Sequence, residues 1–437
     1  MKSKKLWSIL LCLCFALLFP VNSFSYESDP SSSTQTEELK ARIDSLEKDL
    51  ADTKKEISEI QKEKTPVPEK KKAGIHIGGA LRVNYSYLDW DEGDHDRGGD
   101  FTFDTFRLNL DGELGKILLS AEYRFYPEYG FHTIHHGWMG YNFTDDLQAQ
   151  LGVSKVPFGI LPFASHSYWF SGAYYVGLED DYDLGLKTIY KRGPWNLQLA
   201  FYKNGELGDP GNSKRYSIDV INNADGGYAG AFADGNEETN QVNARLAYTF
   251  EHGDLGSTEV GLSGMWGQLY NDKTKDMGDH WAGAAHLNGN YGRWNLQLEG
   301  IAYGYDTKDP SSVTIDGSAV PVDKDIITMG AYSYSWGVPA KALIGTANLA
   351  YGLPVNWGPI SKLTFYSDNT VIQPNKSRFA AIWQNVVGCL VTAGPVYTYV
   401  DLISGRNMIF MGGNMVGGPA ASTGRNTRLN INFGYYF

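Results

Sequence analysis

Three histidines close together in the sequence, His132, His135 and His136, are a residue type and number that could hold a transition metal. Apolar and polar residues alternate around them, which predicts a strand. On a strand, His135 points to the opposite face from His132 and His136, so at most two imidazoles converge. No cysteine or further carboxylate follows at close spacing. The pattern therefore favours ordinary histidines at the rim of the fold over a metal site.

Other motifs of enzyme chemistry are missing from the sequence. It contains no Gly-x-Ser-x-Gly element for a nucleophile and no Gly-x4-Gly-Lys loop for phosphates. Three methionines, Met408, Met411 and Met415, lie in a Gly-rich stretch that is typical of a flexible outer loop. We expect no catalytic residue, no cofactor and no enzymatic activity.

Basic residues recur on the polar faces of the predicted strands. The set comprises Arg82, Arg107, Arg124, Lys187, Arg245 and Arg428. Fewer carboxylates share these faces, namely Asp111, Glu122, Glu259 and Glu299. Side chains that line a water-filled space act on the ions that pass through it. Two interpretations stay open for each arginine. It is either an ordinary solvated charge paired with a nearby carboxylate, or it helps to guide solutes through such a space.

The elements that carry these charges are predicted strands that begin at Gly74. Leu81, Val83 and Tyr85 alternate with polar residues, and the same period of two recurs to the end of the chain. The strands run to about ten residues, longer than the usual five or six. Tight turns such as 191–194 alternate with long polar connections such as 205–239. This pattern predicts a closed transmembrane antiparallel β-barrel in an all-β protein.

Counting predicts about 16 strands. Eleven end near Asp306 and five begin near Lys341, which requires residues 307–340 to form one long outer loop. A further strand over residues 326–336 would make seventeen and would leave a long loop on the wrong side. The final Gly-Tyr-Tyr-Phe resembles the terminal signal by which bacterial outer-membrane barrels are recognised, with Phe437 as the assembly signal.

The N-terminal part of the sequence indicates an exported protein with a helical segment in front of the barrel. Residues 1–25 have the basic start, short apolar run and small residues of a signal peptide, against the alternative of an uncut anchor. Residues 26–72 form a predicted α-helical coiled coil followed by a Pro/Lys linker. Its apolar positions are spaced 4, 3, 4, 3, which is compatible with a dimer or a trimer. A single surface helix is the alternative. The barrel then occupies residues 73–437.

The formal net charge of −12 argues against nucleic acid as a partner. Beyond the N-terminus, no apolar run of about 18 residues exists, which excludes a helical membrane protein.

The stretch from Leu151 to Gly159 contains Gly-x-x-Lys-x-Pro-Phe-Gly and resembles an element of the phosphate-selective porin (O and P) family. The resemblance implies a homotrimer of sixteen-stranded barrels. It also implies that residues 160–182 fold into the lumen and narrow it, so Lys155, His166 and Asp181 join the candidate pore-lining residues. The charge departs from this family, because residues 74–437 hold 25 basic and 38 acidic residues.

The sequence therefore predicts a porin of the bacterial outer membrane with its N-terminal segment in the periplasm. It would pass small hydrophilic solutes or ions, with anions such as phosphate as one candidate. Two alternatives stay open. Tyr168, Trp169, Tyr174 and Tyr175 would suit a sugar channel, and the coiled coil would suit a structural anchor to the cell wall or another periplasmic partner. Expected partners are two further copies, membrane lipid and lipopolysaccharide.

Overall fold

The computed structural model describes residues 74–437 except 223–231, 234, 316 and 417–423, together with Ser45 and Lys48. The predicted signal peptide, coiled coil and linker lie outside the described residues, apart from those two helical positions. The chain divides into two units, Met1–Lys72 and Ala73–Phe437.

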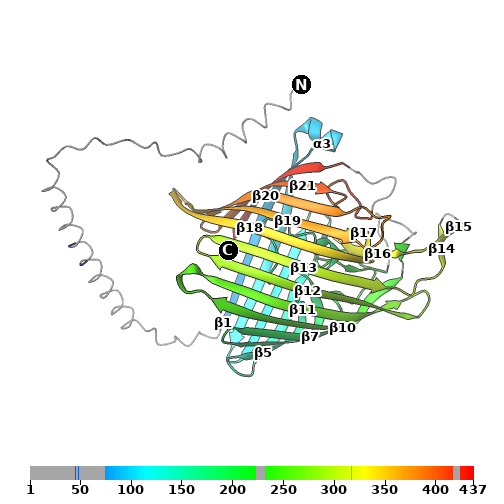
Figure 1. The fold of residues 1–437 in the computed structure, drawn as a ribbon, viewed down its shortest axis with the longest axis horizontal. Coiled ribbons are helices and arrows are strands. Elements are labelled where there is room, and N and C mark those ends of the chain that lie inside the picture. Colours follow the sequence, from blue (N-terminus) through cyan, green and yellow to red (C-terminus); the bar gives the residue numbers. More distant parts are fainter. Residues whose placement is uncertain are drawn as a thin grey trace, which may run out of the picture. The chain divides into compact units, whose positions relative to one another are not determined.

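Within the described part of the second unit, sixteen antiparallel strands close into a barrel (Figure 1). They are β1 (Gly74–Leu88), β2 (Asp100–Leu114), β3 (Ile117–Tyr126), β4 (Phe131–Asn142), β5 (Leu147–Lys155), β6 (Tyr182–Arg192), β7 (Trp195–Gly205), β10 (Asn236–Glu251), β11 (Ser257–Asn271), β12 (Met277–Tyr291), β13 (Trp294–Asp306), β18 (Lys341–Trp357), β19 (Ile360–Pro374), β20 (Ile382–Ala393), β21 (Val396–Arg406) and β22 (Asn426–Tyr436). Each strand pairs with the next one in this order, and β1 pairs with β22 to close the ring.

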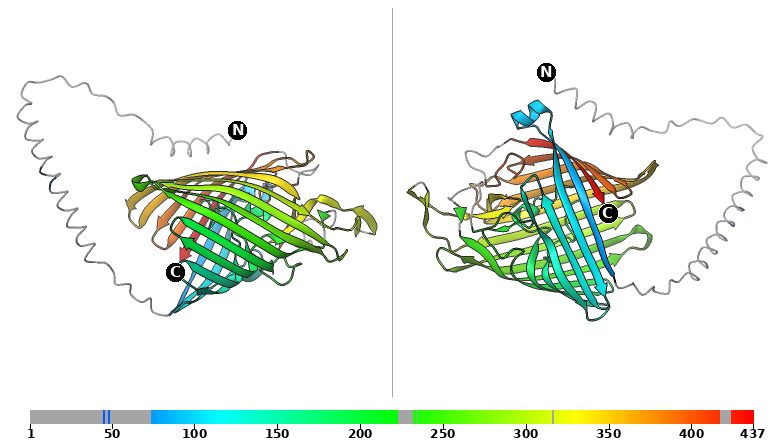
Figure 2. Two further views of the ribbon diagram at one scale, coloured as in Figure 1. Left: turned by 60° about the horizontal axis from the view of Figure 1, so that its bottom comes forward. Right: turned by 180° about the vertical axis from the view of Figure 1, so that it is seen from behind.

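The predicted strand count and fold class are confirmed. Eleven barrel strands end at Asp306 and five more begin at Lys341, with residues 307–340 as one long connection. Short turns lie at one end of the barrel, here called the turn end, and the longer connections begin at the other, the loop end (Figure 1). Figure 2 shows the inclined strands of the wall from two further sides.

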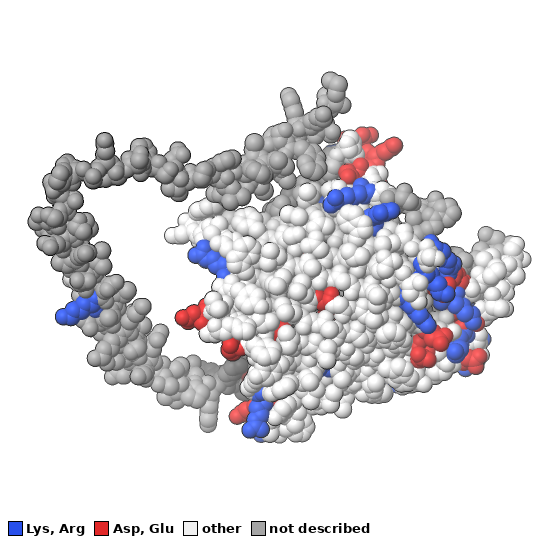
Figure 3. All heavy atoms as spheres, viewed as in Figure 1, with Lys and Arg blue, Asp and Glu red and all other residues white. Residues whose placement is uncertain are grey.

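The outer surface of the barrel is apolar. Large side chains such as Ile77, Leu262 and Leu343 are more than half exposed, because they alternate with the inward polar residues. On the face drawn in Figure 3, most charged side chains gather towards the two ends of the strands. At the turn end, Trp195 packs on Tyr248 with their ring centroids 4.7 Å apart. This surface has the composition expected for contact with lipid. No helix among the described residues is long and apolar enough to cross a membrane.

Four connections at the loop end are named by their order. Loop 3 is 156–181 and contains the 3-10 helix η1 (Tyr174–Val176), loop 4 is 206–235, loop 6 is 307–340 and loop 8 is 407–425. Loop 4 holds β8 (Asp219–Val220) and β9 (Phe232–Ala233), and loop 6 holds β14 (Ser312–Ile315), β15 (Ser318–Pro321), β16 (Asp323–Ala331) and β17 (Tyr334–Pro339). The first connection carries α3 (Glu92–Arg97), and β10 and β11 are joined through η2 (Gly253–Leu255).

Residues 326–331 and 334–336 are strand, but they do not enter the barrel. They belong to the β16–β17 hairpin, which pairs with β8 and β9 of loop 4 in a separate small sheet. Ile327, Met329 and Trp336 of this hairpin are fully buried. Its apolar residues therefore pack among the loops, which explains how a strand-like segment and an even strand count coexist.

The expectation of a flexible loop around the three methionines is wrong. Met408, Met411 and Met415 are all buried, and they belong to the same apolar cluster as Trp336 and Tyr175. Unbranched methionine side chains adapt to irregular gaps between loops. Loop 8 thus packs against loops 3 and 6.

Candidate functional site

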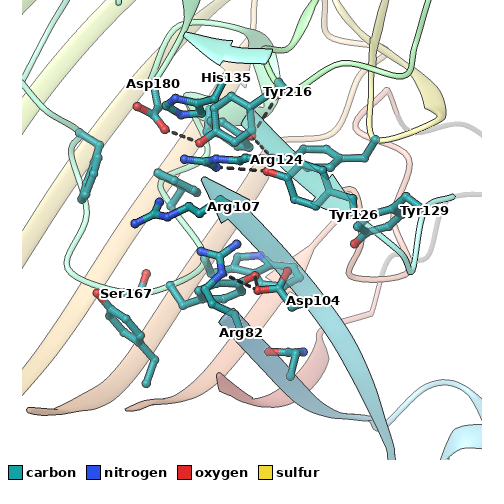
Figure 4. A pocket seen from close by; sticks show the side chains of 18 of the residues that line it. Arg82, Asp104, Arg107, Arg124, Tyr126, Tyr129, His135, Ser167, Asp180 and Tyr216 are labelled. Carbon is teal, nitrogen blue, oxygen red and sulfur yellow. Dashed lines mark hydrogen bonds and ion pairs between the residues drawn. The ribbon is translucent and has the colours of Figure 1, made fainter. Parts of the chain in front are cut away.

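A cavity of about 510 Å³ lies inside the barrel, between loop 3 and the wall made by β1 to β5 and β22 (Figure 4). Its basic lining residues are Arg82, Arg107, Arg124, Lys155 and Arg428, and its acidic ones are Asp104, Glu122, Glu128 and Asp180. Many aromatic rings complete the lining, among them Tyr126, Tyr168, Trp169, Tyr174 and Tyr216. The cavity is therefore both charged and aromatic.

Three arginines on neighbouring strands form a row on the wall, as Figure 4 shows for Arg82, Arg107 and Arg124. Arg107 lies directly opposite Arg124 in the pairing of β2 with β3. Like charges in that position repel each other unless a counter-charge intervenes. Glu122 supplies it, since its carboxylate contacts the guanidinium of Arg124 and lies 3.5 Å from that of Arg107. Arg82 has its own partner, Asp104, at 2.8 Å.

Arg428 on β22 differs from the other cavity arginines. Its Cζ atom lies 4.4 Å from the ring centroid of Trp169, and its Nη2 donates to Asn430 Oδ1 at 3.3 Å. Among the described residues, no carboxylate forms an ion pair with it, and its buried Nε has no hydrogen-bond partner. Arg428 thus presents a positive charge that no described carboxylate contacts, although Glu128 lines the same cavity.

Lys155 stands at the junction of β5 and loop 3. Its Nζ forms an ion pair with Asp180 and donates to Pro162 O at 2.8 Å. It thereby joins the first and last parts of loop 3 and borders the cavity.

Three other candidate residues do not line this cavity: Arg245 and His166 fix loop 3 to the barrel wall, and Lys187 joins β6 to the end of β5. Arg245 donates from Nε to Gly159 O at 2.7 Å and pairs through Nη2 with Glu259 at 2.6 Å. Lys187 Nζ donates to Lys155 O at 2.8 Å. In loop 3 itself, His166 Nδ1 lies 2.7 Å from Asp368 Oδ1. Arg245 on β10 and Asp368 on β19 thus hold loop 3 inside the barrel from two different strands.

The start of loop 3 follows a path that only a small residue suits. Gly159 has φ +59°, and a Cβ placed there would lie 2.1 Å from Glu299 Oε1. That same oxygen accepts a hydrogen bond from Ile160 N at 2.8 Å. The glycine of the Lys-x-Pro-Phe-Gly element therefore permits close contact between loop 3 and β13.

Loop 3 also reaches the arginine wall. Tyr168 OH donates to Asp104 Oδ2 at 2.9 Å, and the Tyr168 ring lies 5.3 Å from Arg82 Cζ. On the other side, Tyr168 N donates to Asp401 on β21 at 3.2 Å. The loop therefore extends across the interior and divides it, as the resemblance implied for residues 160–182.

Burial changes the proton affinity of groups in loop 3. The Glu179 carboxyl is fully enclosed, which raises its pKa to about 8, although a hydrogen bond from Ser171 opposes the shift. Burial works against the charged form of His166, but the hydrogen bond and charge of Asp368 outweigh it, so the pKa of His166 is raised. Near neutral pH, Glu179 is thus largely protonated.

The predicted orientation of the histidines is wrong. In the pairing of β3 with β4, Glu122 faces His136 and Tyr123 faces Ile134, so His135 is an extra residue in a β-bulge. The bulge turns both His135 and His136 towards the cavity, with their Nδ1 atoms 2.8 Å apart. His132 instead contacts Tyr123 on the exposed side. Glu122, His135 and His136 bring ligand atoms within 4.8 Å of one another, but Arg124 and Arg107 already engage this carboxylate.

Asp181 does not border the cavity either. It is buried at the end of loop 3, beside Asp183 and Asp219. The predicted set therefore divides into five cavity residues, two that anchor loop 3, Lys187 between β5 and β6, and Asp181 in a separate acidic group. Phe437 lies at the end of β22, where its backbone pairs with Gly79 of β1.

Two cavity tyrosines escaped the sequence reasoning because they come from loops. The ring centroid of Tyr216 in loop 4 lies 4.4 Å from Arg124 Cζ. The ring of Tyr332 in loop 6 packs edge-on against the ring of Tyr216. The apolar character of residues 326–336 was the available signal, since a solvated outer loop would not need it.

The sequence matches no protein-family model and no curated protein sequence. Solved structures nevertheless share the fold. The anion-selective porin from Comamonas acidovorans has 11% identity and a TM-score of 0.52, with 84% of this chain and 100% of that chain covered. OmpF of Salmonella typhi, in complex with daunomycin, has 10% identity and a TM-score of 0.51, with 84% and 98% covered. The trimer form of OmpT from Vibrio cholerae has 13% identity and a TM-score of 0.50, with 84% and 99% covered.

At such low identity the likeness concerns the fold: the chain has the barrel architecture of Gram-negative outer-membrane porins. The narrower resemblance to the phosphate-selective family is not confirmed and stays a prediction.

Proposed function

We propose that this protein is a diffusion channel of the outer membrane that admits small hydrophilic solutes and prefers anions, with phosphate among the candidates. The observation that carries the proposal is the charge of the cavity. Five basic side chains and four carboxylates line it among the described residues, and Arg428 is the basic group without a carboxylate partner.

The sharing of Glu122 strengthens this charge argument. One carboxylate serves both Arg107 and Arg124, so the pair keeps an excess of one positive charge. Together with Arg428 this outweighs the carboxylate of Glu128, and the cavity has a net of one positive charge. Guanidinium groups bind oxyanions through two parallel N–H donors, which suits phosphate or carboxylate solutes. The acidic excess of the whole chain does not oppose this, because a pore acts on ions through the charges of its own lumen. Asp96 in α3, for example, is highly exposed and not part of the cavity.

A channel for sugars is the second candidate, favoured by the aromatic lining. Phe170 and Tyr174 stack with ring centroids 4.5 Å apart, and Tyr168 borders the same cavity. Aromatic faces of this kind pack against the apolar faces of sugar rings.

Reconstitution into planar bilayers tests both candidates. We expect current steps, a reversal potential with the sign of chloride selectivity across a KCl gradient, and reduced current when phosphate is added. A potential of cation sign contradicts anion preference. Block by maltodextrins or sucrose without block by phosphate would favour the sugar channel. Absence of steps from folded, inserted protein would overturn the channel function and favour the structural anchor.

We also propose that the barrel forms a homotrimer in contact with lipopolysaccharide, with residues 26–72 in the periplasm. The sixteen-stranded fold, the heptad spacing of residues 39–60 and the trimeric state named for OmpT support this assembly. Deleting residues 26–72 behind an intact signal peptide is expected to leave the conductance of each barrel unchanged and to lower the temperature at which trimers dissociate. Loss of attachment to the cell wall in the same variant would add a tethering role.

A further inference from the structure

A second charged group, separate from the cavity, lies where loop 3 meets loop 4. It consists of Asp181 at the end of loop 3, Asp183 on β6 and Asp219 on β8, here called the aspartate cluster. All three side chains are buried, and each offers an oxygen atom within 4.8 Å of the others. The cluster therefore concentrates three carboxylates from three different elements in a space that water hardly reaches.

The surroundings compensate little of this negative charge. Arg215 in loop 4 pairs with Asp219 at 2.6 Å and with Glu206 at 3.6 Å. Glu206 is a fourth buried carboxylate, so the guanidinium is already shared. Among the described residues, Arg215 is the basic residue that forms an ion pair with a member of the cluster.

One oxygen of the cluster lacks a hydrogen bond. Gln241 Nε2 donates to Asp183 Oδ2 at 3.1 Å, whereas Asp183 Oδ1 has no partner among the described groups, although the residue is only 3% exposed. Leaving a buried carboxylate oxygen unpaired costs free energy unless a proton or a cation meets it. Burial and the neighbouring carboxylate of Asp183 raise the pKa of Asp181. The cluster therefore lacks the positive charge that would stabilise ionised carboxylates.

We propose that the aspartate cluster binds one divalent cation, with Ca²⁺ as the ion that suits it best. Carboxylate oxygens are the donors that hard cations prefer, and Ca²⁺ bonds to oxygen at about 2.3–2.6 Å. Two oxygens on one such ion lie at most about 5 Å apart, which agrees with the spacing of the cluster. Backbone carbonyls or water would complete its shell, and Ca²⁺ accepts irregular geometries that Mg²⁺ does not.

Such an ion would connect three parts of the molecule. Asp181 belongs to the loop that divides the barrel, Asp183 to the wall, and Asp219 to the strand that pairs with β16 of loop 6. A bound cation therefore stabilises the position of loop 3 and the small sheet at the loop end. This role does not depend on which solute the channel passes.

The test uses the full-length mature protein, refolded without lipopolysaccharide and freed of metal with EDTA. CaCl₂ is titrated by calorimetry, and Tb³⁺ is added in a second experiment, with emission excited through the neighbouring Tyr182. We expect one Ca²⁺ per chain, sensitised Tb³⁺ emission that Ca²⁺ removes, and a higher unfolding temperature with Ca²⁺ present. Asp183→Asn is expected to weaken binding at least tenfold.

Asp96→Asn is the matched control, since Asp96 is an exposed acid of α3. It is expected to bind Ca²⁺ as the unsubstituted chain does. Asp219→Asn is measured in parallel, so that a folding failure of one variant leaves the other to decide. Absence of saturable Ca²⁺ binding to the folded, unsubstituted chain overturns the proposal. Equal binding by the folded aspartate-cluster variants overturns it as well, because the ions would then sit on other acidic groups.

Discussion

The guanidinium of Arg428 lies over the indole of Trp169, with its Cζ atom 4.4 Å from the ring centroid. This contact joins the last barrel strand to loop 3 and places a positive charge at the edge of the cavity. Because the aromatic face supplies attraction without neutralising the charge, Arg428 stays available to an anion.

Replacing Arg428 by glutamine is expected to lower anion preference without closing the channel. Removing one charge at the wall weakens the attraction for an anion by about 1 kcal/mol, which corresponds to about a fivefold change in the permeability ratio. The reversal potential across a KCl gradient measures this. Arg192→Gln, at the exposed turn-end residue of β6, is the control and should leave the potential unchanged. An unaltered potential in the Arg428 variant would assign the selectivity elsewhere.

Substituting Gly159 by alanine tests the entry of loop 3. Two costs add there, since the positive φ strains any side chain by about 1–2 kcal/mol and the new Cβ meets Glu299. Gly193→Ala is a matched control, because its φ is +55° and nothing lies within 4 Å of the added atom. The Gly159 variant should unfold at a lower denaturant concentration than the Gly193 variant and show noisier open-channel current. Equal midpoints would show that the contact with Glu299 yields without cost.

The raised pKa of Glu179 leads us to expect that the free energy of unfolding depends on pH. A carboxyl whose pKa rises from 4.5 to about 8 on folding binds its proton more tightly in the folded state. Stability is therefore lost as pH rises from about 4.5 to 8, by up to about 1.4 kcal/mol per unit. Glu179→Gln mimics the protonated form and should remove this part of the slope. Unfolding midpoints in detergent at pH 5, 7 and 9 measure it, and parallel profiles for both proteins would contradict the assignment.

Arg245 is predicted to anchor loop 3 rather than to act on solutes. Arg245→Met removes the donor to Gly159 and leaves Glu259 and His286 without the cation, at a cost of about 3 kcal/mol. We expect a lower denaturant midpoint and current noise from a displaced loop, with the sign of selectivity preserved. Arg293→Met, at an exposed turn, is the control. A reversed potential in the Arg245 variant would make Arg245 part of the conducting path.

The strand order was predictable because alternation and turn residues are local signals. The ends at Asp306 and Lys341 follow from the period of two and from the need for an even count. The same period of two also predicted which arginines point into the barrel. A β-bulge inserts one residue into that period without marking the sequence, so the facing of His135 could not be read.

Loop structure depends on contacts between distant segments, which a single sequence does not display. Met411 is buried in an apolar cluster that residues of loops 3 and 6 share, and Asp181 lies beside Asp219 of loop 4. The sequence thus indicated the residue types of the site but not their division between cavity, anchors and aspartate cluster.

The pairing of β8 with β16 has a consequence for assembly. These strands belong to loops 4 and 6, so the pairing of Val220 with Met329 joins segments that four barrel strands, β10 to β13, separate in the sequence. Contacts between distant segments form late because loop closure costs entropy before it is rewarded. We therefore expect a biogenesis intermediate whose ring of strands is complete while the apolar hairpin of loop 6 is still uncovered. That intermediate, rather than the finished channel, would be the species most exposed to proteases and chaperones.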